Sequence, residues 1–148
     1  MKASRRDRSS LLLLVDTHAL IWMVEEVSQM GVRAAEALNR AGWESRILVS
    51  AITPWEIGLL VSKGRLKLGS GVMEWIRAAL AKPGIRLSPL EPEIAVASTK
   101  LPFEINGDPA DRILVATARH LGAALVTADG ALLEIAANGH FKAMDARD

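Results

Sequence analysis

The sequence contains no cysteine, which excludes disulfide bonds and thiolate zinc sites. It also has no apolar run that approaches the roughly 20 residues needed to span a bilayer. Basic residues precede the leucines at 11–14, as in a signal peptide, but Asp16 and His18 soon interrupt the apolar stretch and no small-residue cleavage site follows. We therefore expect a cytoplasmic protein without a membrane segment.

The chain also lacks an excess of charge of either sign, since its net charge is only +1 over 148 residues. Hydrophobic residues make up 50% of the chain and charged residues 24%, which argues against disorder and fits one globular domain. Four of the 18 basic residues nevertheless precede the first apolar run. They are Lys2, Arg5, Arg6 and Arg8. We predict a basic, disordered extension over residues 1–10, solvated rather than bound to RNA phosphates, and a single domain over residues 11–148.

Apolar, β-rich runs alternate along the chain with helical patterns, which predicts an α/β fold with a mostly parallel central sheet flanked by helices. We expect strands at 11–15, 47–50, 85–88, 124–127 and 141–144, and helices at about 19–26, 31–41, 72–81 and 92–100. Two further helices are marked by their first residues. Thr53, Pro54 and Glu56 have the spacing of a capping box, and Asp108 precedes Pro109 as an N-cap does.

Four acidic residues stand where a strand should end or a helix should begin. They are Asp16, Glu56, Asp111 and Asp129. Because the carboxyl ends of parallel strands meet at one edge of a sheet, we expect these side chains to face one site. Glu56 and Asp111 also have a structural interpretation as helix-start acids, whereas Asp16 and Asp129 follow buried strands, where a cap does not explain the desolvation. Clustered carboxylates suit Mg²⁺ or Mn²⁺, which activates water for phosphodiester hydrolysis.

Four blocks of the sequence carry a family resemblance. They are LLVDTHAL at 13–20, SAITPWEI at 50–57, GDPADRIL at 107–114 and LVTAD at 125–129. In this order they resemble the successive blocks of PIN-domain proteins, in the VapC-like toxin branch. The resemblance implies a PIN-like fold and a metal-dependent endoribonuclease that cleaves RNA, the toxin of a type II toxin–antitoxin pair. It also implies a cognate antitoxin and a homodimer.

The resemblance assigns the metal-binding and catalytic roles to Asp16, Glu56, Asp111 and Asp129, with Mg²⁺ or Mn²⁺ as the cofactor. By the same resemblance, Ser50 and Thr127 match polar positions near the metal, Arg112 matches a basic residue beside the third acid, and these three are supporting residues. Asp108 is a candidate outer member of the site. Asn106 and Ala110 replace a histidine and an aromatic residue that the branch often has, which we expect to change substrate preference more than metal binding.

Other residues have weaker functional interpretations. His18, His120 and His140 lack metal-ligand spacing, so we expect structural or solvent-facing roles. Trp22 and Trp55 lie in apolar helical patterns, which favours core or dimer contacts over base stacking.

Two other classes of protein need weighing. A phosphatase of the haloacid dehalogenase type would have a second acid at the position of His18, which makes that class a weak alternative. The stronger alternative is a PIN fold that works by binding RNA or a protein with little nuclease activity, and the intact set of four acids argues against it.

Overall fold

A computed structural model describes residues 10–148, so the prediction for the basic extension falls outside the described residues except at Ser10. One five-stranded sheet forms the centre, with every neighbouring pair parallel and the strand order β3-β2-β1-β4-β5. Its strands are β1 (Leu13–Val15), β2 (Ile47–Ser50), β3 (Ile85–Ser88), β4 (Ala124–Thr127) and β5 (Lys142–Asp145). The predicted α/β class and all five strands are confirmed, with shifts of one or two residues at β1 and β5.

Seven helices connect and cover these strands within residues 10–148. They are α2 (Thr17–Glu25), α3 (Val32–Trp43), α4 (Ile52–Ser62), α5 (Val72–Leu80), α6 (Pro92–Ser98), α7 (Pro109–Leu121) and α8 (Gly130–Ala137). Six correspond to predicted helices, and α8 was not predicted. None of them is both long and apolar enough to cross a membrane.

The predicted capping box at the start of α4 is wrong. The helix begins at Ile52, two residues before the predicted first helical residue Pro54, so Thr53 lies inside its first turn. There the Thr53 side chain is fully buried and its hydroxyl has no hydrogen-bond partner among residues 10–148. The Ser50 hydroxyl accepts instead from the Ile52 amide at 3.1 Å, so the last residue of β2 satisfies a free amide at the helix start.

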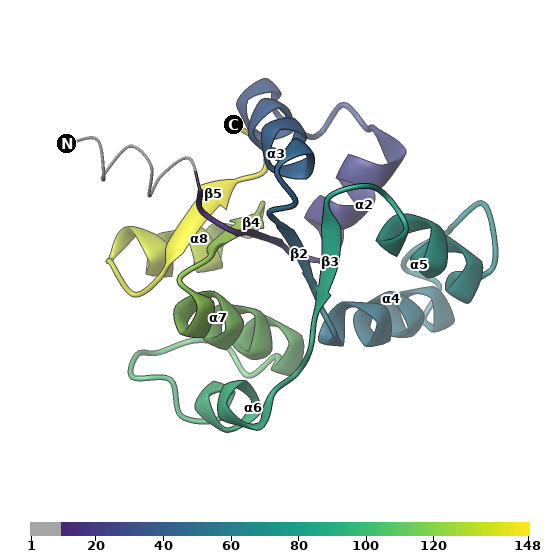
Figure 1. Cartoon of the computed structure of the whole chain (residues 1–148). Coiled ribbons are helices and arrows are strands. Elements are labelled where there is room, and N and C mark those ends of the chain that lie inside the picture. Colours follow the sequence, from purple (N-terminus) through teal and green to yellow (C-terminus); the bar gives the residue numbers. More distant parts are fainter. Residues whose placement is uncertain (1–9) are drawn as a thin grey trace.

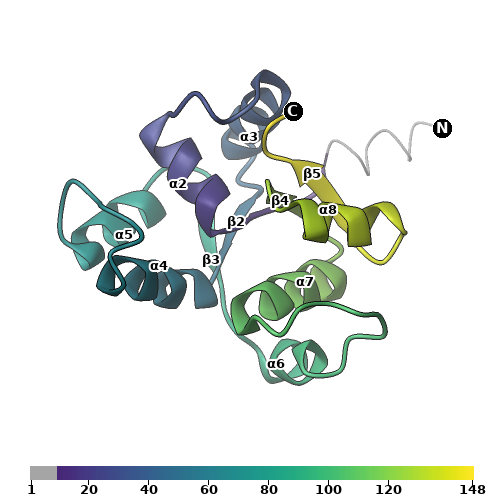
Figure 2. The ribbon, with the colours of Figure 1, turned by 180° about the vertical axis from the view of Figure 1, so that it is seen from behind.

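Alternate strand residues pack into two separate cores. Leu13, Val15, Ile47, Val49, Ala124 and Val126 belong to one core, whereas Leu14, Leu48 and Leu125 belong to the other. Figures 1 and 2 show α2, α3 and α5 on the first side of the sheet and α7 and α8 on the second. Helix α4 contacts both α5 and α7, and α6 packs on α7. The strands are therefore covered on both faces, as is typical of parallel sheets.

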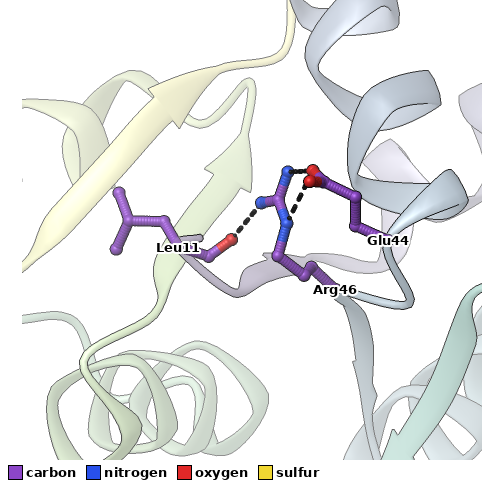
Figure 3. A network of polar contacts seen from close by, with 3 residues as sticks. All are labelled: Leu11, Glu44 and Arg46. Atoms are coloured by element: carbon purple, nitrogen blue, oxygen red, sulfur yellow. Dashed lines mark hydrogen bonds and ion pairs between the residues drawn. The ribbon is translucent and has the colours of Figure 1, made fainter. Parts of the chain in front are cut away.

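Arg46 fixes the amino end of the sheet (Figure 3). Its guanidinium donates to the Leu11 carbonyl at 2.5 Å and pairs with the Glu44 carboxylate. The Arg46 carbonyl in turn accepts from the Leu13 amide at 2.8 Å, next to the Leu13–Ile47 pair of the β1–β2 register. This network anchors the start of β1, and the opposite end of that strand carries Asp16.

Candidate active site

The strand order brings the predicted acids to one edge of the sheet. Asp16 follows β1, and Asp129 follows the neighbouring strand β4 by two residues. Together with Glu56 of α4, Asp111 of α7 and Asp108, they line one cavity of about 370 Å³. The structure therefore gathers all four predicted acids and Asp108. Their catalytic and metal-binding roles stay a prediction.

Asp16 is held by hydrogen bonds to both of its carboxylate oxygens. It caps α2 by accepting from the Ala19 amide at 2.8 Å, and its other oxygen accepts from the Thr127 hydroxyl at 2.5 Å. Burial raises the pKa of Asp16 above its ordinary value, and these two hydrogen bonds oppose the rise. The carboxylate is thus fixed in position although its charged form is poorly solvated.

Thr127 connects the two strand-end acids. Its hydroxyl donates to Asp16 and accepts from the Asp129 amide at 3.1 Å, while the Asp129 carboxylate accepts from the Leu132 amide at 3.0 Å and caps α8. Each of these two acids caps a helix, a role that we predicted for neither, but the hydrogen bonds of Asp16 do not cancel the effect of burial on its pKa. Thr127 contacts both acids directly, as its predicted supporting role requires.

Glu56 is positioned by a residue that we did not single out from the sequence. The buried Thr17 hydroxyl donates to a Glu56 oxygen, which joins the first residue of α2 to α4. Thr17 directly follows Asp16 in the first sequence block, and that position was the available signal. Through Thr17, the position of Glu56 depends on the same helix start that Asp16 caps.

Asn106 organises the third part of the site. Its side-chain oxygen accepts from the Asp108 amide at 2.8 Å, and its side-chain nitrogen donates to Asp111 at 3.1 Å. Asp108 accepts from the Asp111 amide at 3.1 Å, which confirms it as the N-cap of α7. The loop before α7 therefore orients both acids through one amide side chain.

The surroundings of Asp111 disfavour its charged form. Burial raises its pKa to about 6, and repulsion from Asp108, Asp129 and Glu56 acts in the same direction. The hydrogen bond from Asn106 opposes the rise. The electrostatic effect of three other acids on Asp111 shows that the cavity concentrates negative charge.

Arg112 supports the backbone and does not line the cavity. Its guanidinium donates to the Ser98 carbonyl at 2.9 Å and to the Asn106 carbonyl at 3.3 Å. It therefore braces the loop that carries Asn106 and Asp108 against α6. Ser50, likewise predicted as supporting, holds the start of α4 and does not line the cavity.

The histidines occupy structural or exposed positions, as predicted. His140 stacks on Phe103 with ring centroids 4.4 Å apart, and His120 is exposed near the end of α7. His18 is also exposed, but it lines the acidic cavity and its charge opposes the raised pKa of Asp16. The position of His18 in the sequence does not indicate this contribution.

Trp22 and Trp55 differ in their surroundings. Trp22 is half-buried, packs against the core and lines the cavity. Trp55 is 51% exposed, which contradicts a core position, whereas the dimer contact that the sequence equally predicts stays a prediction. The buried residues of α4 are Thr53 and Ile57, each two positions away from Trp55, which places Trp55 on the opposite face of the helix.

The donors that line the cavity are of the chemical type that a divalent cation binds. Within residues 10–148, no three acidic or histidine side chains lie close enough together to form a ready-made metal site. The donors are nevertheless carboxylate oxygens, and Mg²⁺ commonly keeps several waters while it contacts only one or two protein carboxylates. A cation would also relieve the repulsion that acts on Asp111. The residues present therefore fit such an ion by their chemistry.

Comparisons with known proteins agree on one family. The family model described as PIN domain matches residues 13–138. Ribonuclease VapC22 of Mycobacterium tuberculosis is 32% identical over 117 residues, which cover 79% of this chain and 86% of that protein.

Solved structures show the same fold at lower identity. VapBC2 from Rickettsia felis, bound to a DNA fragment from its promoter, contains a chain that matches with a TM-score of 0.62 at 13% identity, covering 90% of this chain and 98% of the matched one. FitAcB from Neisseria gonorrhoeae matches with a TM-score of 0.61 at 22% identity, covering 91% and 98%. A toxin–antitoxin complex from Klebsiella pneumoniae matches with a TM-score of 0.52 at 24% identity, covering 79% and 86%.

Proposed function

This chain belongs to the PIN-domain family, and on that premise we propose that it is a metal-dependent endoribonuclease, the toxin of a type II toxin–antitoxin pair. The observation that carries the proposal is the cavity into which the fold gathers Asp16, Glu56, Asp111 and Asp129. The relative Ribonuclease VapC22 supports RNA as the substrate. Membership of the PIN-domain family also argues against the alternative that the chain is a phosphatase of the haloacid dehalogenase type.

In this proposal Asp16, Glu56, Asp111 and Asp129 hold one or two Mg²⁺ or Mn²⁺ ions. A bound ion would lower the pKa of water and neutralise charge on the scissile phosphate. The chain itself contributes orientation, because Thr127, Thr17 and Asn106 fix the carboxylates through hydrogen bonds. Asp108 holds the start of α7 and is the candidate outer member of the site.

The proposed partners are a cognate antitoxin and a second copy of the chain. The antitoxin is supported by the family resemblance and by the fold shared with a chain of a toxin–antitoxin complex from Klebsiella pneumoniae. The homodimer rests on the resemblance alone. Exposed apolar side chains such as Trp55, 51% exposed, and Val96, 56% exposed, offer surface for protein contacts.

The test is cleavage of a mixed cellular RNA pool by the purified full chain, free of antitoxin, with Mg²⁺, Mn²⁺ or a chelator. The variants are Asp16→Asn and Glu56→Gln. Glu56 is the more discriminating position because it caps no helix. The matched control is Glu74→Gln, an exposed acid in the first turn of α5 and outside the cavity.

We expect discrete fragments that require the metal, and a loss of activity on the order of 10² or more in both cavity variants but not in the control. Full activity in Asp16→Asn or Glu56→Gln would refute the site assignment. If the folded wild-type chain cleaves nothing with either metal, the function shifts to a module that binds RNA or protein without hydrolysis.

A further inference from the structure

The acidic cavity poses an electrostatic problem for an RNA substrate. Five carboxylates line it, and the RNA backbone carries one negative charge per phosphate. Among the described residues that line this cavity, only His18 and Arg147 can carry positive charge. The electrostatic effect of His18 falls on Asp16. Of His18 and Arg147, Arg147 is the one that always carries its positive charge.

Backbone hydrogen bonds dock the segment that contains Arg147. The Ala146 amide donates to the Thr127 carbonyl at 2.8 Å, and the Ala146 carbonyl accepts from the Gly31 amide at 2.9 Å. The Asp148 backbone oxygen accepts from the Ala34 amide at 3.0 Å, and Figure 1 shows this end of the chain beside α3. The residues on both sides of Arg147 are thus held between β4 and the start of α3.

Gly31 permits this docking. A Cβ atom at that position would lie 2.0 Å from the Asp148 backbone oxygen and 2.4 Å from the Arg147 carbonyl carbon. Only a residue without a side chain allows so close an approach between the two backbones. Close packing of the two backbones therefore holds the backbone of Arg147 in place, and its side chain extends from a fixed position.

The Arg147 guanidinium is available to an anion. The residue is exposed, and its backbone amide donates to the Asp145 side chain at 2.9 Å. Within the described part of the chain, the one ion pair joins Arg46 and Glu44, so Arg147 makes no direct ion pair with a carboxylate there. An arginine on a rigid support matches the two-oxygen geometry of a phosphate.

We propose that Arg147 binds a backbone phosphate of the RNA at the mouth of the acidic cavity. This inference rests on the proposed function in so far as RNA is the substrate. The carboxylates repel phosphates, and Arg147 offsets that repulsion where the strand enters. It binds the substrate and takes no part in the bond cleavage.

Binding of a labelled single-stranded RNA, measured by fluorescence anisotropy over a series of salt concentrations with chelator present, tests this role. The proteins compared are the wild type, Arg147→Ala, Arg147→Lys and the control Arg77→Ala, an exposed arginine of α5 outside the cavity. Arg147→Ala should bind about tenfold more weakly. The slope of log K against log salt should become shallower by about 0.7, the loss of one phosphate contact on a single strand.

Arg147→Lys should keep the salt slope but recover only part of the affinity, because it restores the charge without the two-pronged geometry. Arg77→Ala should match the wild type. The inference is overturned if Arg147→Ala binds with wild-type affinity and slope, or if the wild type binds no RNA. If Arg147-dependent binding holds but no metal supports cleavage, the proposed nuclease fails and this inference stands.

Discussion

Thr53 carries a buried hydroxyl without a hydrogen-bond partner in the described structure. Because an unsatisfied buried polar group is destabilising, replacing it with a methyl group of similar size should stabilise the fold. We expect Thr53→Val to raise the free energy of unfolding by about 1 kcal/mol, measured by chemical denaturation. The control is Thr117→Val, a buried threonine whose hydroxyl donates to the Ile113 carbonyl at 2.7 Å. Equal loss of stability in both variants would contradict the prediction.

The raised pKa of Asp111 predicts an unusual dependence of stability on pH. Its ordinary value is 3.8 and its value in the fold is about 6, so between these two pH values the folded chain binds more protons than the unfolded chain. The contribution of this group to the free energy of unfolding therefore falls as the pH rises through that window. The raised pKa of Asp16 acts in the same direction.

Asp111→Asn removes that ionisation. Without divalent cations, we expect this variant to be more stable than the wild type at pH 7 and to lose less stability between pH 4 and pH 6. Denaturation measured across the pH range checks this, with Glu93→Gln of α6 as an exposed control outside the cavity. If the stability of the wild type and that of Asp111→Asn depend on pH in the same way, the interpretation is refuted.

At the residue scale, the acids of the cavity could be predicted from the sequence better than the residues that form hydrogen bonds to them. The acids could be predicted because each stands at a recognisable boundary between elements. Thr17 could not, since its hydrogen bond to Glu56 joins residues 39 positions apart. The contacts of Asn106 with Asp108 and Asp111 are local, but the sequence does not show which way an amide side chain in a loop points. The capping role of Asp108 could be predicted, because Asp108 stands directly before Pro109 and a cap interacts with its own helix.

At the scale of elements, Asp129 has two roles that substitution can separate. It caps α8, and it contributes a carboxylate to the cavity. Asp129→Ser keeps a capping oxygen without the charge, whereas Asp129→Ala removes both. We expect both variants to lose RNA cleavage, and only the alanine variant to lose stability, by about 1 kcal/mol in thermal or chemical unfolding. Normal cleavage by the serine variant would refute a catalytic role for Asp129.

The elements themselves followed from the sequence wherever an apolar run or a cap marked them. The three strands β2, β3 and β4 match their predicted bounds, since each is a short apolar or β-rich run. Helix α8 was not predicted, because its eight residues are too short for a clear period and its cap was interpreted as a site residue. The predicted start of α4 was wrong because the Ser50 hydroxyl, on the preceding strand, accepts from a free amide at the helix start, the role that we assigned to Thr53.

At the scale of the whole molecule, the proposed metal site predicts stabilisation by divalent cations. A ligand that binds only the folded state at 100 times its Kd adds about 2.7 kcal/mol, which raises the Tm of a chain of this length by roughly 5 to 10 °C. We expect Mg²⁺ or Mn²⁺ to raise the Tm at pH 7.5 and the effect to shrink in Asp111→Asn. An equal rise with KCl at matched ionic strength would show general charge screening instead.

The strand order is the part of the fold that the sequence did not specify. Alternating strand and helix patterns indicated a parallel sheet, but they do not show that β1 lies between β2 and β4. That arrangement places Asp16 against Thr127, which lies 111 positions away along the chain. The shared site therefore depends on long-range pairing that no local pattern reveals.

The central place of β1 in the sheet also means that the acidic cavity can form only late in protein synthesis. The ribosome produces β1 first, yet β4, its partner on one side, is among the last elements to emerge. Until then, Asp16 lacks its bond from Thr127, and neither Asp129 nor the segment of Arg147 exists. A growing chain therefore has no assembled acidic cavity, and the proposed activity begins only when translation of this domain is nearly complete.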